Sequence, residues 1–241
     1  MIDEILQLTG SLSADFKKKF YGTTFRCPVC HLELAHADLD ANGLVVCPLC
    51  GVVMEVEEVY GHNVPVINDV ELFRPQPKSR LHPLAAHLPI GLFPLAVAGA
   101  VLVLAISAID LLWKDLPTGW LAVIQHMPLM ADATLLLLVL SVVFSAPAFA
   151  LGYRDWKRRY RGRPYRIIRL KIVFSALFLV LGTSAAALHG AGLVMRPGTG
   201  LFDLASPTHF VFGLVYLGLL AANLCVIATL GHVGGNLVYG K

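Results

Sequence analysis

The chain has 241 residues, of which 56% are hydrophobic and 15% are charged, with a formal net charge of +3 and a mean hydropathy of +0.69. Because a soluble globular domain carries about 25% charged residues, this composition excludes an ordinary soluble protein and indicates membrane spans. The apolar excess lies almost wholly in residues 84–240, so we expect a water-soluble unit followed by a lipid-soluble one.

Residues 1–20 lack the continuous apolar core and the small-residue cleavage site of a secretory signal. They predict instead a short amphipathic helix with a basic end. We therefore expect the N-terminal unit, residues 1–60, to stay in the cytosol. Cysteines remain reduced there, and close cysteine spacings favour a metal site over disulfides.

Two Cys-x-x-Cys pairs predict a metal site in this unit. Cys27 and Cys30 form the first pair, and Cys47 and Cys50 form the second, with sixteen residues between the pairs. This spacing can place four thiolates around one ion with tetrahedral geometry. Four sulfur ligands suit zinc and iron equally, so the ligand set alone leaves both metals open.

The segment 27–51 resembles both zinc ribbons and rubredoxin. Its flanks have strand propensity, so we expect a small β-rich domain. The second knuckle, CPLCG, matches rubredoxin well, but in the first, CPVCH, His31 stands where rubredoxin has glycine. This difference favours zinc over iron. Zinc would stabilise the fold, whereas iron would carry one electron. His31, His36 and His62 are predicted to be surface residues, because four sulfurs already complete the ligand shell.

The residues between this domain and the apolar unit, 61–83, are predicted to form an extended and partly stiff linker. They contain Pro65, Pro75 and Pro77, and the residue before a proline is biased towards extended backbone. The linker would hold the metal domain close to the bilayer.

Four apolar stretches after the linker are long enough to cross a hydrocarbon core of ~30 Å, which takes ~20 helical residues. They cover approximately residues 84–113, 129–153, 168–195 and 208–233. The predicted fold class is therefore an all-α membrane protein, a four-helix transmembrane bundle over residues 84–241 that carries the β-rich metal domain at its N-terminal side. Asn223, near the middle of the fourth stretch, is predicted to form an interhelical hydrogen bond.

The segment between the second and third stretches, residues 154–171, contains nine basic residues and one acidic residue. By the positive-inside rule it is cytoplasmic, and with four spans both termini are cytoplasmic too. The sequence thus predicts a multi-pass protein of the bacterial cytoplasmic (inner) membrane. The basic residues would serve this orientation, with contact to anionic lipid or to an acidic partner as the alternative.

Histidines gather at both ends of the predicted bundle. His87 and His232 fall at the cytoplasmic ends, whereas His126, His189 and His209 fall at the outer ends. Two imidazoles from different helices can ligate haem iron, and ionisable groups within spans often mark functional sites. We expect an inner haem b pair of His87 with His232 and an outer pair drawn from the other three. The alternative is that these histidines bond headgroups or carbonyls, while the small residues near them serve helix packing.

Residues 82–240 resemble a widespread bacterial family of small four-helix membrane proteins with the pattern HPxxxHxPIG … GxxGGxLVY. The resemblance is carried by three motifs, His82-Pro-Leu-Ala-Ala-His87-Leu-Pro-Ile-Gly91, Gly152-Tyr-Arg-Asp155 and Gly231-His-Val-Gly-Gly-Asn-Leu-Val-Tyr239. It implies the four-helix membrane fold and favours an inner site containing His87, Asp155 and His232. The family has no settled activity, and its pattern does not include the outer histidines.

Two functions fit these features. The first is a membrane electron-transfer subunit that binds haem b and passes electrons between a quinone pool and a cytosolic-side partner. The second is a non-redox membrane scaffold or regulator whose zinc ribbon docks a partner. The chain shows no nucleophile triad, phosphate-binding loop or dinucleotide fingerprint, so any enzyme activity would be cofactor redox chemistry within a membrane oxidoreductase complex. Expected partners are the lipid bilayer, other subunits of such a complex and quinone, with no nucleic acid.

Overall fold

The computed structural model describes residues 23–60, 62–71, 81–113, 118–163 and 165–239. The amphipathic helix predicted over residues 1–20 lies outside them. The described chain forms two compact units. The metal unit contains the described residues up to 71, Asp155–Lys171 and the residues from His232 onward; the helical unit contains the remainder.

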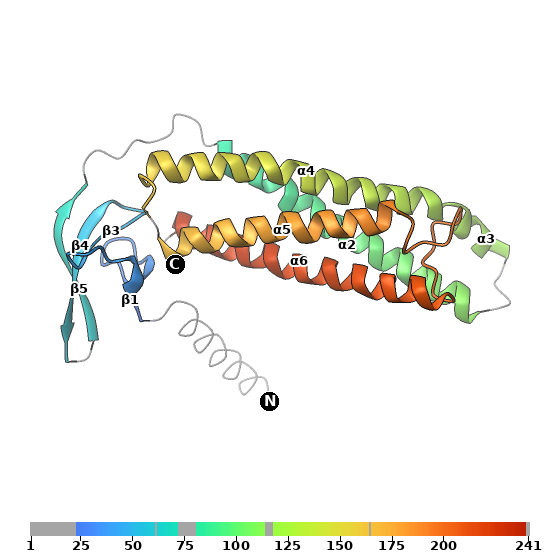
Figure 1. Ribbon diagram of the computed structural model, residues 1–241, viewed down its shortest axis with the longest axis horizontal. Helices are drawn as coiled ribbons and strands as arrows, with labels where there is room; N and C mark the ends of the chain where they lie inside the picture. Colours follow the sequence, from blue (N-terminus) through green and yellow to red (C-terminus); the bar gives the residue numbers. More distant parts are fainter. Residues whose placement is uncertain (1–22, 61, 72–80, 114–117, 164, 240–241) are drawn as a thin grey trace. The chain divides into compact units, whose positions relative to one another are not determined.

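Within the described residues, the metal unit is built on five short strands. They are β1 (Thr24–Arg26), β2 (Glu33–Ala35), β3 (Leu44–Val46), β4 (Val52–Val59) and β5 (His62–Val70), with a 3-10 turn, η1 (His36–Asp38), after β2. β1 pairs with β2, and β3, β4 and β5 form a second antiparallel sheet in that order (Figure 1). The first cysteine pair occupies the β1–β2 turn and the second occupies the β3–β4 turn. The predicted small β-rich region around the cysteines is confirmed.

The assignment of residues 62–70 to a linker is wrong, because these residues form strand β5. Val64 pairs with Glu57 and Val66 pairs with Glu55 along the whole length of β4. The alternating Val-Pro-Val-Ile pattern has the period of a strand as well as the extension of a linker. Pro65 is tolerated because β5 lies at the edge of the sheet, where a missing N–H interrupts no ladder.

The four predicted apolar stretches are confirmed as helices. They are α2 (Leu81–Leu112), α4 (Met127–Arg159), α5 (Arg166–Gly190) and α6 (Pro207–Tyr239), and a short helix that was not predicted, α3 (Thr118–Gln125), precedes α4. These four described helices are long and apolar enough to cross a membrane. They run side by side as a bundle (Figure 1).

The third helix ends earlier than the predicted boundary at residue 195. The N–H of Gly192 donates to the carbonyl of His189 (3.0 Å), and the N–H of Leu193 donates to the carbonyl of Leu188 (3.2 Å). This pair of bonds is the Schellman motif, in which the chain turns away and the last helical carbonyls are satisfied. The apolar stretch of the sequence thus extends past the end of α5, because apolar residues continue into the loop after the helix has ended.

Contacts between distant helices hold the helical unit together. The rings of Phe93 on α2 and Phe178 on α5 pack edge to face with centroids 5.4 Å apart. Ser141 on α4 donates to the carbonyl of Pro89 on α2 (3.2 Å), and the buried Asn223 amide donates to the carbonyl of Phe178 (3.3 Å). The predicted interhelical hydrogen bond of Asn223 is thereby confirmed.

Large apolar side chains also point outward from all four long helices. Examples are Leu95 (58% exposed), Leu136 (58%), Val180 (63%) and Val211 (56%). A water-soluble bundle keeps such side chains inside, whereas a bundle in lipid can expose them without cost. The exterior of this unit therefore suits a lipid bilayer.

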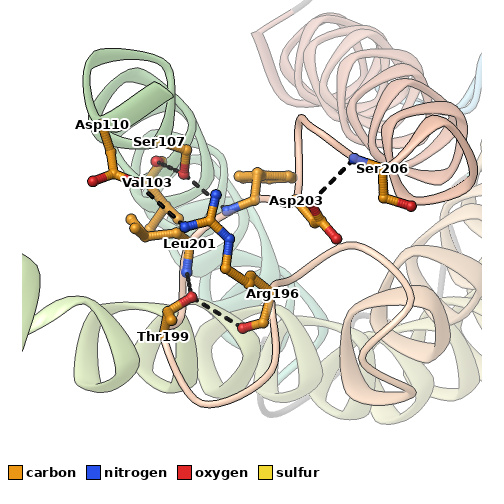
Figure 2. A network of polar contacts seen from close by, with 9 residues as sticks. Val103, Ser107, Asp110, Arg196, Thr199, Leu201, Asp203 and Ser206 are labelled. Atoms are coloured by element: carbon orange, nitrogen blue, oxygen red, sulfur yellow. Dashed lines mark hydrogen bonds and ion pairs between the residues drawn. The ribbon is translucent and has the colours of Figure 1, made fainter. Parts of the chain in front are cut away.

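The loop of residues 191–206, between α5 and α6, is folded onto the helices (Figure 2). Arg196 pairs with Asp110 of α2 (3.3 Å), and the backbone N–H of Phe202 donates to Ser107 Oγ (2.8 Å). Within the loop, Thr199 donates to the carbonyl of Arg196 (3.0 Å). Leu201 and Phe202 are buried, so this loop is a fixed part of the helical unit.

Candidate metal centre

The sulfur atoms of Cys27, Cys30, Cys47 and Cys50 all lie within 4.8 Å of one another. Cys27 Sγ is 3.6 Å from Cys50 Sγ, and Cys30 Sγ is 3.4 Å from Cys47 Sγ, so two of the sulfur contacts join one hairpin to the other. An ion ~2.3 Å from each of four tetrahedral sulfurs requires sulfur separations of about 3.8 Å. The four side chains therefore fit a single zinc or iron ion.

Each cysteine pair lies on a knuckle with the same backbone geometry. The N–H of His31 donates to the carbonyl of Cys27 (2.9 Å), and the N–H of Gly51 donates to the carbonyl of Cys47 (3.0 Å). Both donors have left-handed backbone, with φ of 59° at His31 and 87° at Gly51. His31 thus adopts the conformation that glycine normally supplies at this position of a knuckle.

Burial and backbone N–H groups act in opposite directions on the thiols. Burial raises the pKa of Cys30 to about 11 and also raises the pKa of Cys47. Burial opposes ionisation of Cys27 as well, but the N–H groups of Cys30 and Val29, which point at its sulfur, outweigh it and lower the pKa. Metal binding must displace the thiol protons, so we expect loading of the site to weaken as the pH falls.

The two cysteines of each pair differ in exposure. Cys27 and Cys47 are fully buried, as are the apolar side chains Leu32 and Met54 of the same unit, whereas Cys30 and Cys50 are partly exposed. A bound ion would therefore be shielded on one side and close to solvent on the other. Such a site can hold a structural ion or, with iron, exchange an electron at its exposed edge.

The left-handed positions lead to a paired prediction. Gly51→Ala is expected to weaken metal retention, because a Cβ at this φ costs about 1–2 kcal/mol; the Cβ itself would meet only the Glu71 carbonyl at 3.4 Å, an ordinary contact. His31→Gly is expected to leave retention equal or improved, because it removes a Cβ from the same conformation. Competition against a chelator of known affinity measures both variants. Equal weakening of metal retention in Gly51→Ala and His31→Gly would contradict the role given to the left-handed backbone of the knuckles.

Comparisons with protein families, with curated proteins and with solved structures found no match. The resemblance of residues 82–240 to the bacterial four-helix family remains a prediction.

Two residues outside the cysteine motifs join the 155–171 segment to the cysteine hairpins. The hydroxyl of Tyr165 donates to the carbonyl of Val46 (2.6 Å), directly before Cys47 in the chain. Asp38 Oδ1 accepts the backbone N–H of Arg166 (2.6 Å), the first residue of α5. Sequence reasoning missed both contacts, because neither residue belongs to a recognisable motif.

The outer histidines do not pair with one another in the described residues. His189 is buried, and its Nδ1 lies 3.2 Å from the hydroxyl of Tyr216. His209 Nδ1 lies 3.1 Å from Ser206 Oγ and 3.4 Å from Asp203 Oδ2. His126 is exposed in the break between α3 and α4. The predicted outer haem pair, drawn from these three histidines, stays a prediction.

The inner histidines belong to different units of the chain. His87 lies on the exposed side of α2 in the helical unit, whereas His232 lies on the exposed side of α6 in the metal unit, which also contains Asp155. The inner haem pair and the inner cluster with Asp155 stay predictions. His31, His36 and His62 are exposed and stand outside the four-sulfur cluster, as predicted.

Proposed function

We propose that this protein is a multi-pass membrane scaffold or regulator that presents a zinc-loaded four-cysteine domain for docking of a cytosolic partner. The observation that carries the proposal is the convergence of four sulfurs in a β-rich unit that includes the 155–171 segment. A zinc ribbon is the finer assignment that we propose, because His31 stands where rubredoxin has glycine.

Several features support the membrane part of the proposal. The four long helices are apolar enough to span, and their outward faces carry large apolar side chains. The nine basic residues of the segment 154–171, which runs from the end of α4 into the start of α5, favour a cytoplasmic location for it and for both termini in a bacterial inner membrane. Membership of residues 82–240 in the four-helix family that they resemble belongs to the same proposal.

Exposed apolar side chains of the metal unit support a docking role. Val29 is exposed next to Cys30, and Val64 and Val66 are exposed on the edge strand β5. Tyr60 stands almost fully exposed beside the β4–β5 turn. A protein partner would bury such side chains.

Electron transfer is the second candidate function, and the partial exposure of Cys30 and Cys50 is the observation that favours it. An iron ion held there could exchange an electron across the exposed edge, with other subunits of a redox complex or quinone as partners. Haem b would add a second carrier in the bundle. Among the described residues, only the four-cysteine cluster groups possible metal ligands, so this candidate stands behind the first.

Metal analysis together with an air-oxidised minus dithionite-reduced visible spectrum of the detergent-purified chain decides between the two. We expect about one zinc ion per chain and a featureless spectrum. Iron with absorption that bleaches on reduction would replace the scaffold with an iron electron carrier. Soret and α bands that disappear on replacement of His87 or His232 would establish the haem-based function instead.

A further inference from the structure

The two cysteine hairpins of the metal unit share no strand ladder among the described residues. β1 and β2 form one sheet, and β3, β4 and β5 form the other. Two sulfur contacts, Cys27 with Cys50 and Cys30 with Cys47, each cross from one hairpin to the other. A metal ion bound by all four sulfurs would thus fix the distance between the hairpins.

The first hairpin supplies one contact with the 155–171 segment, and Glu71, which follows β5, pairs with Arg161 (3.2 Å) and Arg163 (3.5 Å) of the same segment. Asp38 follows β2 in the turn η1, where its Oδ2 accepts the N–H of Ala35 (3.0 Å) and its Oδ1 accepts the N–H of Arg166 (2.6 Å). The first N–H groups of a helix have no partner within that helix. A carboxylate at this end accepts such an N–H and is also attracted by the positive end of the helix dipole. Asp38 therefore caps α5 from a segment 128 residues away.

The second hairpin supplies a further contact, at the preceding residue of the segment, Tyr165. Tyr165 is buried, and its hydroxyl donates to the carbonyl of Val46 at the end of β3 (2.6 Å). The ring of Tyr160 packs edge-on against it, with centroids 6.2 Å apart. Tyr165 bonds to the second hairpin and Arg166 bonds to the first. Because the two residues are adjacent, both bonds can form at once only while the distance between the hairpins stays the same.

We propose that metal loading of the four-cysteine site fastens the 155–171 segment to the metal unit, so that the start of α5 responds to metal occupancy. This inference rests on the metal site of the proposed function and adds its regulation. Without the metal, the two hairpins can move apart, and adjacent residues of the segment can no longer hold both. The unit would then loosen its hold on the start of α5, while Glu71 keeps its ion pairs with Arg161 and Arg163.

Hydrogen–deuterium exchange of the full-length, detergent-purified chain tests this inference, with peptides covering residues 160–170 as the readout. We expect removal of the metal by a high-affinity chelator under reducing conditions to speed exchange of these peptides about tenfold. Loss of protection over residues 27–32 verifies that the metal has left. Unchanged exchange at 160–170 after verified metal removal would overturn the inference.

Two conservative variants separate release of the segment from general unfolding. In the loaded protein, Tyr165→Phe is expected to speed exchange at 160–170 while metal content stays the same, and chelation should then add little further change. Tyr60→Phe, at an almost fully exposed position, is the matched control and should behave as wild type. An equally large chelator effect in Tyr165→Phe combined with Asp38→Ala would also overturn the inference. If metal analysis finds iron in the site, the zinc scaffold is refuted, but the coupling between metal occupancy and exchange at residues 160–170 still stands.

Discussion

Replacing Cys47 with serine is expected to abolish metal binding and to unfold the strands of the metal unit. Cys47 is fully buried, and its sulfur contacts the sulfur of Cys30 on the other hairpin. Structural zinc contributes about 10–16 kcal/mol in small zinc-dependent peptides, far more than so small a core supplies alone. Metal content per chain and exchange protection of β3 and β4 measure the loss, and both should fall to background.

The matched control is Cys225→Ser. Cys225 is a free, exposed thiol on α6 that does not belong to the four-sulfur cluster. Its replacement should leave metal content and protection unchanged. Retention of a full complement of metal by the Cys47→Ser chain would refute the four-sulfur site.

A second large effect is expected at Gly200 in the loop between α5 and α6. A Cβ at this position would lie 2.5 Å from the carbonyl oxygen of Met127 and 2.6 Å from the Cα of Pro128. These are backbone atoms that cannot rotate away, and the left-handed φ of 64° adds its own strain. Gly200→Ala should therefore destabilise the helical unit by about 3–5 kcal/mol. A fall in the thermal unfolding midpoint in detergent measures this cost.

Gly198→Ala in the same loop provides the control for backbone conformation. Gly198 has a similar φ of 73°, but a Cβ there would meet nothing within 4 Å. Its replacement should cost only the conformational penalty of about 1–2 kcal/mol. Equal falls in the unfolding midpoint for the two variants would show that the contact with Met127 and Pro128 does not hold the loop.

Features that depend on local composition were determined by the sequence itself. The spacing of the two cysteine pairs predicted one metal cluster, because two intervening residues permit a tight knuckle whatever surrounds it. The lengths of the apolar stretches predicted the four helices, because a helix rises by a constant ~1.5 Å per residue. A lone asparagine in an apolar helix predicted an interhelical bond at Asn223, because its amide needs a partner.

Only the tertiary structure decided features that depend on partners distant in the chain. Strand β5 resembled a linker until its pairing with β4 was known, because extended backbone is common to both. The outer histidines looked alike in sequence, but Tyr216 satisfies His189, whereas Ser206 and Asp203 lie beside His209. Tyr165 and Asp38 gained their roles from Val46 and Arg166, more than a hundred residues away in each case. A hydrogen bond requires two groups at one point in space, and no local pattern specifies where the second group will be.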